Sequence, residues 1–308
     1  MVKLPLVARV PTGNSTEINL RRSAQSAAFI RLEICGFLNM NKFDFLDLQK
    51  RNGKPRKKGL TEIRASYYTV MGLNYLADVL QVASPYVDSV KFAGGSFALY
   101  PDDVLKKFIE TCHRYDVMVS TGGFIEHVLT QGKEKVEKYI DACKEYGFDI
   151  LELSAGFISI PPDDWMRLCE YTIKKGMKAK PEVGVLFGAG GDTKEKEVSE
   201  EQHKDPAIAI NMARRFIDAG AYLIMIESEG ITEDVSRPRT GIPAAFINAL
   251  GTEKLMFEAA DPQVFKWYVK NYGPDVNLFV DHTQILQLEC LRRGMWGTQD
   301  VWGREVRF

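Results

Sequence analysis

The sequence predicts a single-domain α/β fold, a (β/α)8 TIM barrel, from three observations. Eight short apolar runs each end on a polar or acidic residue, most of them are separated by one helix-sized segment, and proline and glycine mark the limits of those segments. Strands of a parallel sheet covered on both faces are nearly continuously apolar, and eight strand–helix units close into a barrel of about 250 residues. A chain of 308 residues, 45% of them hydrophobic, is long enough for one such core.

The expected strands, in chain order, are Phe43–Leu48, Ser89–Gly94, Val117–Gly122, Ile150–Gly156, Ala179–Gly184, Tyr222–Gly230, Leu255–Ala260 and Asn277–Thr283. Between them, apolar residues follow the i, i+3, i+4 spacing of amphipathic helices, as in residues 104–112 and 136–143. Proline stands near the start of several helices, at Pro101, Pro162, Pro206, Pro243 and Pro262. Glycine ends five of them, at Gly147, Gly176, Gly220, Gly251 and Gly273. Each helix is therefore expected to pack one apolar face on the barrel.

Two regions lie outside this alternation. Residues 1–40 are expected to form an N-terminal extension or a cap, and residues 41–308 the barrel domain. The first 35 residues are rich in arginine and serine and poor in acids, which is typical of an organelle transit peptide and also of a poorly ordered terminus. The charged stretch Gly188–Asp205 follows the fifth expected strand, so it is expected to be either a lid over the active face or a solvated insertion.

Composition narrows the class of function. A formal charge of −1 and a pI of about 6.5 argue against nucleic acid or a membrane surface as a general partner. No apolar run approaches the roughly 20 residues that a membrane span needs. The five cysteines include no C-x-x-C pair, so we expect buried free thiols in a reducing compartment. A cytoplasmic location follows, with organelle targeting through residues 1–35 as the alternative, and the oligomeric state stays open, including a homo-oligomer.

The strand ends carry the candidate chemistry, because catalytic groups of such barrels lie at the carboxyl ends of the strands. One group of candidates would bind an anion such as phosphate or carboxylate, through backbone N–H groups beside an ammonium. It consists of Lys91, Gly94, Gly95, Ser96, Gly122 and Gly123. Glycine pairs also serve tight βα turns, which is the structural alternative. The basic loop Lys54–Lys58, with Arg56, is expected after the first strand; taken alone, such a loop is usually solvated.

A second group of candidates is acidic. It comprises Glu152, Glu182, Glu227, Glu229, Glu258 and Asp281, from five different expected strands. Crowded carboxylates repel unless a cation neutralises them, so a hard metal, Mg2+, is expected, with Glu227, Glu229, Glu258 and Asp281 as its candidate ligands. The alternative is that half of these acids point outward or form salt bridges. His282 is the only histidine at an expected strand end, so zinc is not expected.

Several short motifs lie in a characteristic order between residues 54 and 293. They are K-P-R-x-x-G-x-T at Lys54–Thr61, V-K-F-x-G-G-S at Val90–Ser96, T-G-G-x-x-E at Thr121–Glu126, L-E-L-S at Leu151–Ser154, P-E-V-G at Pro181–Gly184, M-F-E-A at Met256–Ala259, G-P-D-V-N-L at Gly273–Leu278 and L-E-C-L-R-R-G at Leu288–Gly294. Together they resemble the phosphosulfolactate synthase family, which also contains plant heat-stress-associated 32-kDa proteins of the same barrel. The stretches Y-V-D-S-V-K-F-A-G-G-S and F-V-D-H-T-Q place the chain nearest the heat-stress branch.

The resemblance implies Mg2+-dependent addition of sulfite to phosphoenolpyruvate, giving (2R)-phospho-3-sulfolactate. Sulfite would attack C3, and a metal ion would stabilise the negative charge that develops on C2 and the carboxylate before an acid protonates C2. Lys91, Glu152 and Glu182 are the implied catalytic residues, with a lysine whose pKa is lowered by desolvation supplying the proton. Arg56, His282 and the glycine turns would hold the phosphate and the sulfonate.

The chain departs from the synthases at three strand ends. Val185 and Leu186 follow E-V-G, where synthases usually have a lysine, and Glu227–Gly230 reads E-S-E-G in place of R-E-S-G. Asp281 and His282 replace a neutral phosphate-binding turn, and a carboxylate at 4 Å from phosphate costs on the order of several kcal/mol at an effective dielectric of 20. Two hypotheses therefore remain: a lyase of the synthase type with the same or a shifted substrate, or a heat-stress protein that acts through protein partners with a degenerate site.

Overall fold

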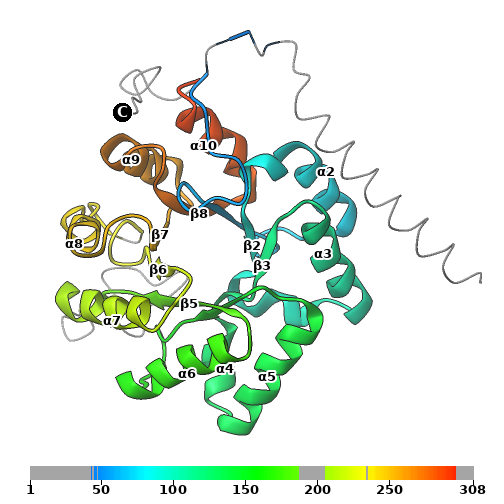
Figure 1. The fold of residues 1–308 in the computed structure, drawn as a ribbon, viewed down its shortest axis with the longest axis vertical. Helices are drawn as coiled ribbons and strands as arrows, with labels where there is room; N and C mark the ends of the chain where they lie inside the picture. The colour runs from blue at the N-terminus through cyan, green and yellow to red at the C-terminus, as the bar shows by residue number, and fades with distance from the viewer. Residues whose placement is uncertain (1–42, 44, 47, 187–204, 234, 296–308) are drawn as a thin grey trace, which may run out of the picture. The chain divides into compact units, whose positions relative to one another are not determined.

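Eight parallel strands form a closed barrel in the second of two units of the chain. The computed structural model describes residues 43, 45–46, 48–186, 205–233 and 235–295, and the units are Met1–Leu48 and Gln49–Phe308. The strands pair in chain order, and the last closes on the first, with Thr61 opposite Leu278. In Figure 1 the strands lie at the centre of this unit and the helices surround them. The predicted (β/α)8 TIM barrel is confirmed.

The strands are β1 (Thr61–Arg64), β2 (Ser89–Lys91), β3 (Met118–Ser120), β4 (Ile150–Leu153), β5 (Lys178–Val183), β6 (Ile224–Ile226), β7 (Leu255–Glu258) and β8 (Asn277–Asp281). The helices are α2 (Leu73–Ala83), α3 (Asp102–Arg114), α4 (Ile125–Leu129), α5 (Lys133–Tyr146), α6 (Pro162–Lys174), α7 (Pro206–Asp218), α8 (Gly241–Leu250), α9 (Pro262–Tyr272) and α10 (Ile285–Arg292). Short 3₁₀ turns follow several strands, among them η2 (Ala93–Leu99), η3 (Gly122–Phe124) and η6 (His282–Gln284). Residues 1–40 and 188–204, which include the expected extension and most of the expected lid or insertion, lie outside the described residues.

The prediction of the first strand was wrong. The described residues between positions 43 and 48 are not in a strand, and Phe43 and Phe45 are 62% and 77% exposed. The first strand is instead Thr61–Arg64, in which Glu62 is completely buried. Charged side chains enter the barrel interior from this strand, so it has no continuous apolar run. The basic loop Lys54–Lys58 therefore precedes the first strand and does not follow it.

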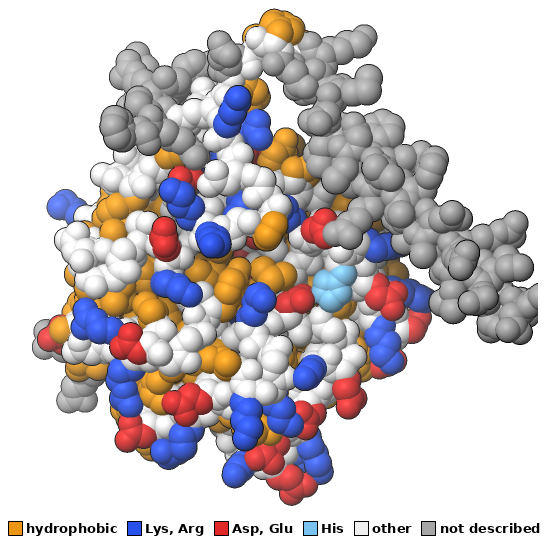
Figure 2. All heavy atoms as spheres, in the orientation of Figure 1, with side chains coloured by type: hydrophobic (Ala, Val, Ile, Leu, Met, Phe, Trp, Pro, Cys, Tyr) orange, Lys and Arg blue, Asp and Glu red, His pale blue; other side chains and the backbone are white. Residues whose placement is uncertain are grey.

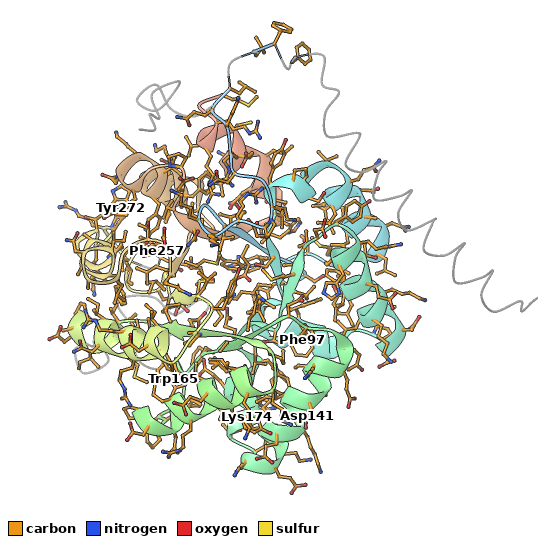
Figure 3. All side chains as sticks on the ribbon, viewed as in Figure 1. Phe97, Asp141, Trp165, Lys174, Phe257 and Tyr272 are labelled. Atoms are coloured by element: carbon orange, nitrogen blue, oxygen red, sulfur yellow. The ribbon has the colours of Figure 1, made fainter. Side chains whose placement is uncertain are left out.

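The helices pack on the sheet as their apolar spacing predicts. Leu105, Phe108 and Cys112 are buried on α3, and Val136 and Ile140 on α5. Trp165, labelled in Figure 3, donates from its indole N–H to the carbonyl of Leu153 at 3.2 Å, which ties α6 to β4. Basic and acidic side chains are interspersed on the face drawn in Figure 2, in keeping with the i, i+4 ion pairs of α3 and α5.

The predicted helix limits and thiols also hold. Proline is the first residue of α6, α7 and α9, and Asp205 and Asp261 cap the last two by accepting from backbone N–H groups at 2.8 and 2.7 Å. Of the described cysteines, Cys112, Cys143 and Cys169 are buried free thiols and Cys290 is half-buried. Among the described residues, no helix is long and apolar enough to cross a membrane.

The amino end of the barrel is closed by packed and hydrogen-bonded side chains. Leu60, Met225, Met256 and Phe279 form a small apolar cluster there. Asn277 accepts from the backbone N–H of Leu60 at 2.9 Å and donates to the carbonyl of Leu255 at 2.9 Å.

Arg56 lies at this amino end, whereas the sequence placed it after the first strand, among residues that bind substrate. Its guanidinium holds both carboxylate oxygens of Asp88, at 2.9 and 2.8 Å. Asp88 lies immediately before β2 and also accepts from the backbone N–H of Thr61 at 2.9 Å. Because the loop precedes β1, Arg56 stabilises the start of two strands and lies outside the cavity at the carboxyl ends.

Candidate active site

A cavity of about 580 Å3 opens at the carboxyl ends of the strands. Its described lining residues are Arg64, Tyr67, Tyr68, Lys91, Ala93, Gly94, Gly123, Phe124, Glu126, His127, Thr130, Glu152, Ser154, Phe157, Ile158, Glu182, Glu227, Glu229, Glu233 and Glu258. Seven of these are glutamates, while the basic side chains are Arg64, Lys91 and His127. The structure thus brings together eight of the predicted residues: Lys91, Gly94, Gly123, Glu152, Glu182, Glu227, Glu229 and Glu258.

Lys91 is the centre of the charged cluster in this cavity. Its ammonium nitrogen lies 3.0 Å from Glu152, 3.4 Å from Glu182 and 3.8 Å from Glu258. It also lies 4.5 Å from the centre of the ring of Phe279, a buried residue of β8. Since these side chains come from β2, β4, β5, β7 and β8, closure of the barrel is what assembles the cluster.

The pKa values of the acids around Lys91 are shifted in different directions. Burial, together with the nearby charge of Glu152, raises the pKa of Glu182 to about 8. Burial and the charge of Glu258 raise the pKa of Glu227 well above its ordinary value, and Glu227 shares a hydrogen bond with Glu258. For Glu258, burial acts in the opposite direction to the attraction of Lys91, and the net pKa is lowered. The cavity therefore holds an acid whose pKa is about 8, Glu182, beside acids whose pKa is lowered, and divergent pKa values of this kind are what acid–base catalysis uses.

Lys91 itself does not have the lowered pKa that the sequence suggested. Burial alone would lower the pKa of Lys91, but the carboxylates of Glu152, Glu258 and Glu182 raise it well above the ordinary value. Lys91 is therefore held as an ammonium ion. It can stabilise negative charge on a ligand, whereas Glu182 is better placed to give up a proton near neutral pH.

A second lysine supports the cluster from below. Lys180 is completely buried and lies 3.0 Å from Glu152, on the side away from Lys91. Lys180 also pairs with Glu62, whose other oxygen accepts from the Ser89 hydroxyl at 2.9 Å. Glu152 is thus bridged by two ammonium groups, and the pKa of Glu152 is lowered by them despite the opposing effect of burial.

The glycines after β2 and β3 are required mainly by the backbone conformation and close packing of these turns. Gly95 and Gly122 are buried and have φ of 72° and 63°. A Cβ on Gly122 would stand 2.0 Å from the carbonyl oxygen of Phe92, and a Cβ on Gly95 would stand 2.1 Å from the ring of Phe124. Only glycine fits these positions. Gly94 and Gly123 do line the cavity, while Gly95, Gly122 and Ser96 do not.

Asp281 and His282 lie outside the described lining of the cavity, so their roles in metal and substrate binding stay predictions. Asp281 caps the turn η6, because its carboxylate accepts from the backbone N–H and the hydroxyl of Thr283 at 2.9 and 2.6 Å. His282 is buried, and its ring meets the edge of Tyr75 from α2 at 5.6 Å between centroids. Local capping therefore uses the Asp281 carboxylate that the sequence assigned to a metal.

Four charged residues of the site were not predicted. Glu62 and Arg64 belong to the strand that the apolar pattern missed, and Lys180 alternates with Glu182 along β5. Glu126 accepts from the Ser154 hydroxyl at 2.6 Å and from two backbone N–H groups of the loop after β4. The sequence did carry a signal for Glu126, because it ends the T-G-G-x-x-E motif.

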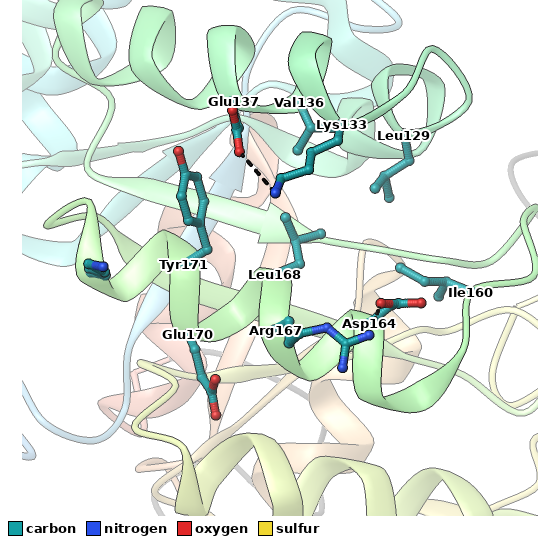
Figure 4. Close-up of a pocket in the computed structure, with 11 residues that line it drawn as sticks. Leu129, Lys133, Val136, Glu137, Ile160, Asp164, Arg167, Leu168, Glu170 and Tyr171 are labelled. Carbon is teal, nitrogen blue, oxygen red and sulfur yellow. Dashed lines mark hydrogen bonds and ion pairs between the residues drawn. The ribbon is translucent and has the colours of Figure 1, made fainter.

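Another cavity, of about 810 Å3, lies on the outside of the barrel between α5 and α6. Figure 4 shows apolar side chains such as Leu129, Val136 and Leu168 beside the ion pair of Lys133 and Glu137, which is 3.7 Å long. This cavity is the larger of the two, but it contains no strand end and no buried charge cluster. The cavity at the strand ends is therefore the better candidate for chemistry.

The acids of the mouth cavity match Mg2+ in chemistry, since every donor is a carboxylate oxygen. No three acidic, imidazole or thiol side chains among the described residues are arranged as a finished metal site. Mg2+ usually binds through one or two carboxylates and keeps several waters, so three protein ligands are not required. Glu227 and Glu258 share a hydrogen bond, and a divalent cation could take the place of that proton.

Comparisons with known proteins identify the family of this chain. Residues 49–298 match the family described as (2R)-phospho-3-sulfolactate synthase (ComA). The Arabidopsis thaliana protein HEAT-STRESS-ASSOCIATED 32 is 37% identical over 80% of this chain and 90% of its own length. Phosphosulfolactate synthases of Methanothermobacter thermautotrophicus and Bacillus subtilis are 28% and 26% identical, over 84% and 83% of this chain and 97% of each relative. The identity is thus higher with the heat-stress-associated protein, as the motifs indicated.

Among solved structures, a carboxyl transferase domain of Rhizobium etli pyruvate carboxylase has a TM-score of 0.50 at 14% identity. The match covers 81% of this chain and 46% of that chain, and at this identity it shows the fold alone. The family match, in contrast, spans every strand of the barrel and all of the residues gathered around Lys91. The chain belongs to the (2R)-phospho-3-sulfolactate synthase (ComA) family.

Proposed function

We propose that this protein is a Mg2+-dependent lyase of the phosphosulfolactate synthase type, which adds sulfite to phosphoenolpyruvate to give (2R)-phospho-3-sulfolactate. The observation that carries the proposal is the Lys91 ammonium surrounded by Glu152, Glu182 and Glu258 inside one cavity at the strand ends. This arrangement pairs a fixed positive charge with an acid of raised pKa, and the reaction needs both.

The chemistry assigns a role to each group. The sulfur lone pair of sulfite forms a bond to C3, and the π electrons move to C2 and the carboxylate. Lys91 stabilises that negative charge as an ammonium ion. Glu182, neutral at pH 7 because its pKa is raised to about 8 by burial, gives its proton to C2. Glu152 keeps Lys91 in place and is itself held by Lys180.

Magnesium would bind at Glu227 and Glu258, with Glu229 as a further lining carboxylate. Bound there, it would act as a Lewis acid that stabilises the enediolate charge. The crowding of these acids supports the assignment, because the pKa of Glu227 is raised by burial and by the charge of Glu258. Replacing that shared proton by a cation would relieve the repulsion.

A specific observation favours the second candidate, a heat-stress-associated protein with a degenerate site that acts through protein partners. Val185 and Leu186 are buried apolar side chains at the end of β5. Asp281 caps a turn where the synthases are expected to hold phosphate. Among the described residues, the mouth therefore has fewer phosphate-binding groups than that substrate would use.

Incubation of the purified protein with phosphoenolpyruvate, sulfite and Mg2+, followed by mass spectrometry for an acid-stable sulfonate, tests the proposal. The wild type should form the product, and Glu182→Gln should slow it by about 10²- to 10⁴-fold through loss of the acid. Lys106→Met is the matched control, because Lys106 forms an exposed ion pair with Asp102 on α3. Absence of product from the wild type, with Mg2+ bound, would leave the second candidate.

A further inference from the structure

Arg64, at the carboxyl end of β1, is positioned by two aromatic rings. Its guanidinium carbon lies 5.0 Å from the centre of the Tyr68 ring and 5.3 Å from the centre of the Phe279 ring. The side chain is 11% exposed and lines the mouth cavity. Stacking on aromatic faces holds a guanidinium in a fixed plane while its N–H groups stay available for a ligand.

The hydrogen-bonding capacity of Arg64 is largely unused within the described part of the chain. Its ion pair there is with Glu258, at 3.9 Å between Nη2 and Oε1. Charge-assisted N–H···O bonds are about 2.7–2.9 Å long, so this contact is not one. Nε is buried and has no hydrogen-bond partner among the described residues. A buried donor without a partner is costly, and a ligand oxygen would offset that cost.

Lys91 approaches the same oxygen of Glu258, at 3.8 Å. Two cations thus stand around one carboxylate oxygen, and neither is close enough for a direct bond. An oxyanion between Arg64 and Lys91 could approach both more closely.

We propose that Arg64 and Lys91 form an oxyanion subsite that binds the carboxylate group of a small substrate. The planar fork of Arg64, which lies close to the rings of Tyr68 and Phe279, matches the two coplanar oxygens of a carboxylate. Glu182 lies 3.4 Å from Lys91, beside the place where the atom bonded to that carboxylate would stand. The subsite rests on the proposed function only for the identity of the substrate, and Arg64 determines specificity in it.

Direct binding titrations by NMR with three probes test the subsite: pyruvate, inorganic phosphate and phosphoenolpyruvate. Arg64→Gln should weaken the binding of pyruvate and of phosphoenolpyruvate by about 10- to 100-fold, because a charge-assisted contact is lost, and should leave phosphate unchanged. Arg64→Lys, which keeps the charge without the fork, should lie in between. Arg293→Gln is the matched control, since Arg293 also stacks on a ring, that of Tyr86 at 5.5 Å, and pairs with Glu289 outside the mouth.

Three results would overturn the inference: wild-type protein that binds neither carboxylate at its solubility limit, Arg64→Gln that binds pyruvate as tightly as wild type, or an equal loss of phosphate binding. Thermal unfolding of each variant verifies that it folds. If Arg64→Gln does not fold, the binding of pyruvate and phosphoenolpyruvate is compared between wild type and Arg64→Lys instead. Arginine-dependent binding without sulfonate formation would refute the proposed lyase and keep the subsite. Sulfonate formation by Arg64→Gln with an unchanged KM would keep the lyase and refute the subsite.

Discussion

The two ends of the barrel both bury charged side chains, but the partners of these side chains differ between the two ends. At the amino end, Arg292 is completely buried and donates to the carbonyls of Gly59 and Val276 at 2.6 and 2.8 Å, and to the hydroxyl of Thr61 at 3.0 Å. At the carboxyl end, Lys91 and Arg64 face a cavity and meet carboxylates at 3.0 Å or more. Burial of charge alone therefore does not mark a functional site.

The difference lies in what each end stabilises. Arg292 donates to the backbone carbonyls of Gly59 and Leu60 and to the side-chain hydroxyl of Thr61, so its hydrogen bonds fix the start of β1. The mouth instead contains two acids, Glu182 and Glu227, whose pKa values are raised by burial and by neighbouring carboxylates, so ionisation of these two opposes folding and would be favoured by a cationic ligand. Substitutions at the amino end should cost stability, whereas those in the mouth should change ligand binding and pH dependence.

The largest effect is expected from Arg292→Met. The change leaves several buried acceptors without a donor, so the free energy of unfolding should fall by about 3–5 kcal/mol. Urea denaturation followed by circular dichroism measures it. Arg293→Met is the control in the next position, where the partly exposed side chain pairs with Glu289, and it should cost less than about 1 kcal/mol. Equal losses in the two variants would contradict the role given to Arg292.

Glu182→Gln is expected to change the free energy of unfolding by a few kcal/mol, and the size of this change should depend on pH. The folded pKa of Glu182 is raised from 4.5 to about 8, mainly by burial, so the folded state binds more protons than the unfolded state in this window. Wild-type stability should therefore fall as pH rises from about 4.5 to 8, while Gln cannot ionise. The stability of Glu182→Gln relative to wild type should then increase between pH 5 and pH 8, on the order of a few kcal/mol.

Urea denaturation of metal-free protein at pH 5 and pH 8 measures this difference. Glu134→Gln serves as the control, since Glu134 is exposed on α5 and pairs with Lys138. The free energy of unfolding of Glu134→Gln should differ from that of wild type by the same small amount at both pH values. A constant difference for Glu182→Gln as well would mean that Glu182 is ionised in the folded protein, and that the acid of the proposed reaction is another group.

A smaller effect, about 1–3 kcal/mol at saturating metal, is expected from Mg2+ through binding to the folded state. Differential scanning calorimetry of chelator-stripped protein, with and without Mg2+, measures it. Glu258→Gln should reduce the stabilisation, because it removes an ionised carboxylate of the mouth, and Glu134→Gln should not. If Mg2+ does not stabilise the wild type, the proposed metal site is wrong.

The fold could be predicted because seven of the strands are short apolar runs buried between the barrel interior and the helices. The first strand could not, because Glu62 and Arg64 alternate with Thr61 and Ile63, and an apolar pattern does not identify a strand whose inward side chains are charged. That error also displaced Arg56, which the sequence placed after a strand that it actually precedes.

The candidate site was predicted in part for a related physical reason. Position at a strand end led to Lys91, Glu152 and Glu182, and the structure brings these three together because closure of a parallel barrel gathers the strand ends. The partners Lys180 and Glu62 were not predicted, because pairing across the barrel depends on register and the sequence does not give it. Protonation states likewise depend on distances between strands.

The smallest effect is expected at Asp281, where a local signal was present in the sequence. Asp281 and Gln284 have the spacing of a capping box, in which each side chain binds the other residue's backbone N–H. Asp281→Ala should lower the free energy of unfolding by about 1 kcal/mol, while Asp281→Asn should change it by only a few tenths, because asparagine also caps well. Neither should alter the affinity for Mg2+ or phosphoenolpyruvate, since Asp281 does not line the mouth in the described structure. Urea denaturation and calorimetric titration measure the two quantities. A weaker Mg2+ affinity in Asp281→Asn, with unchanged stability, would show that the carboxylate leaves the cap to bind metal, and would extend the mouth to the eighth strand.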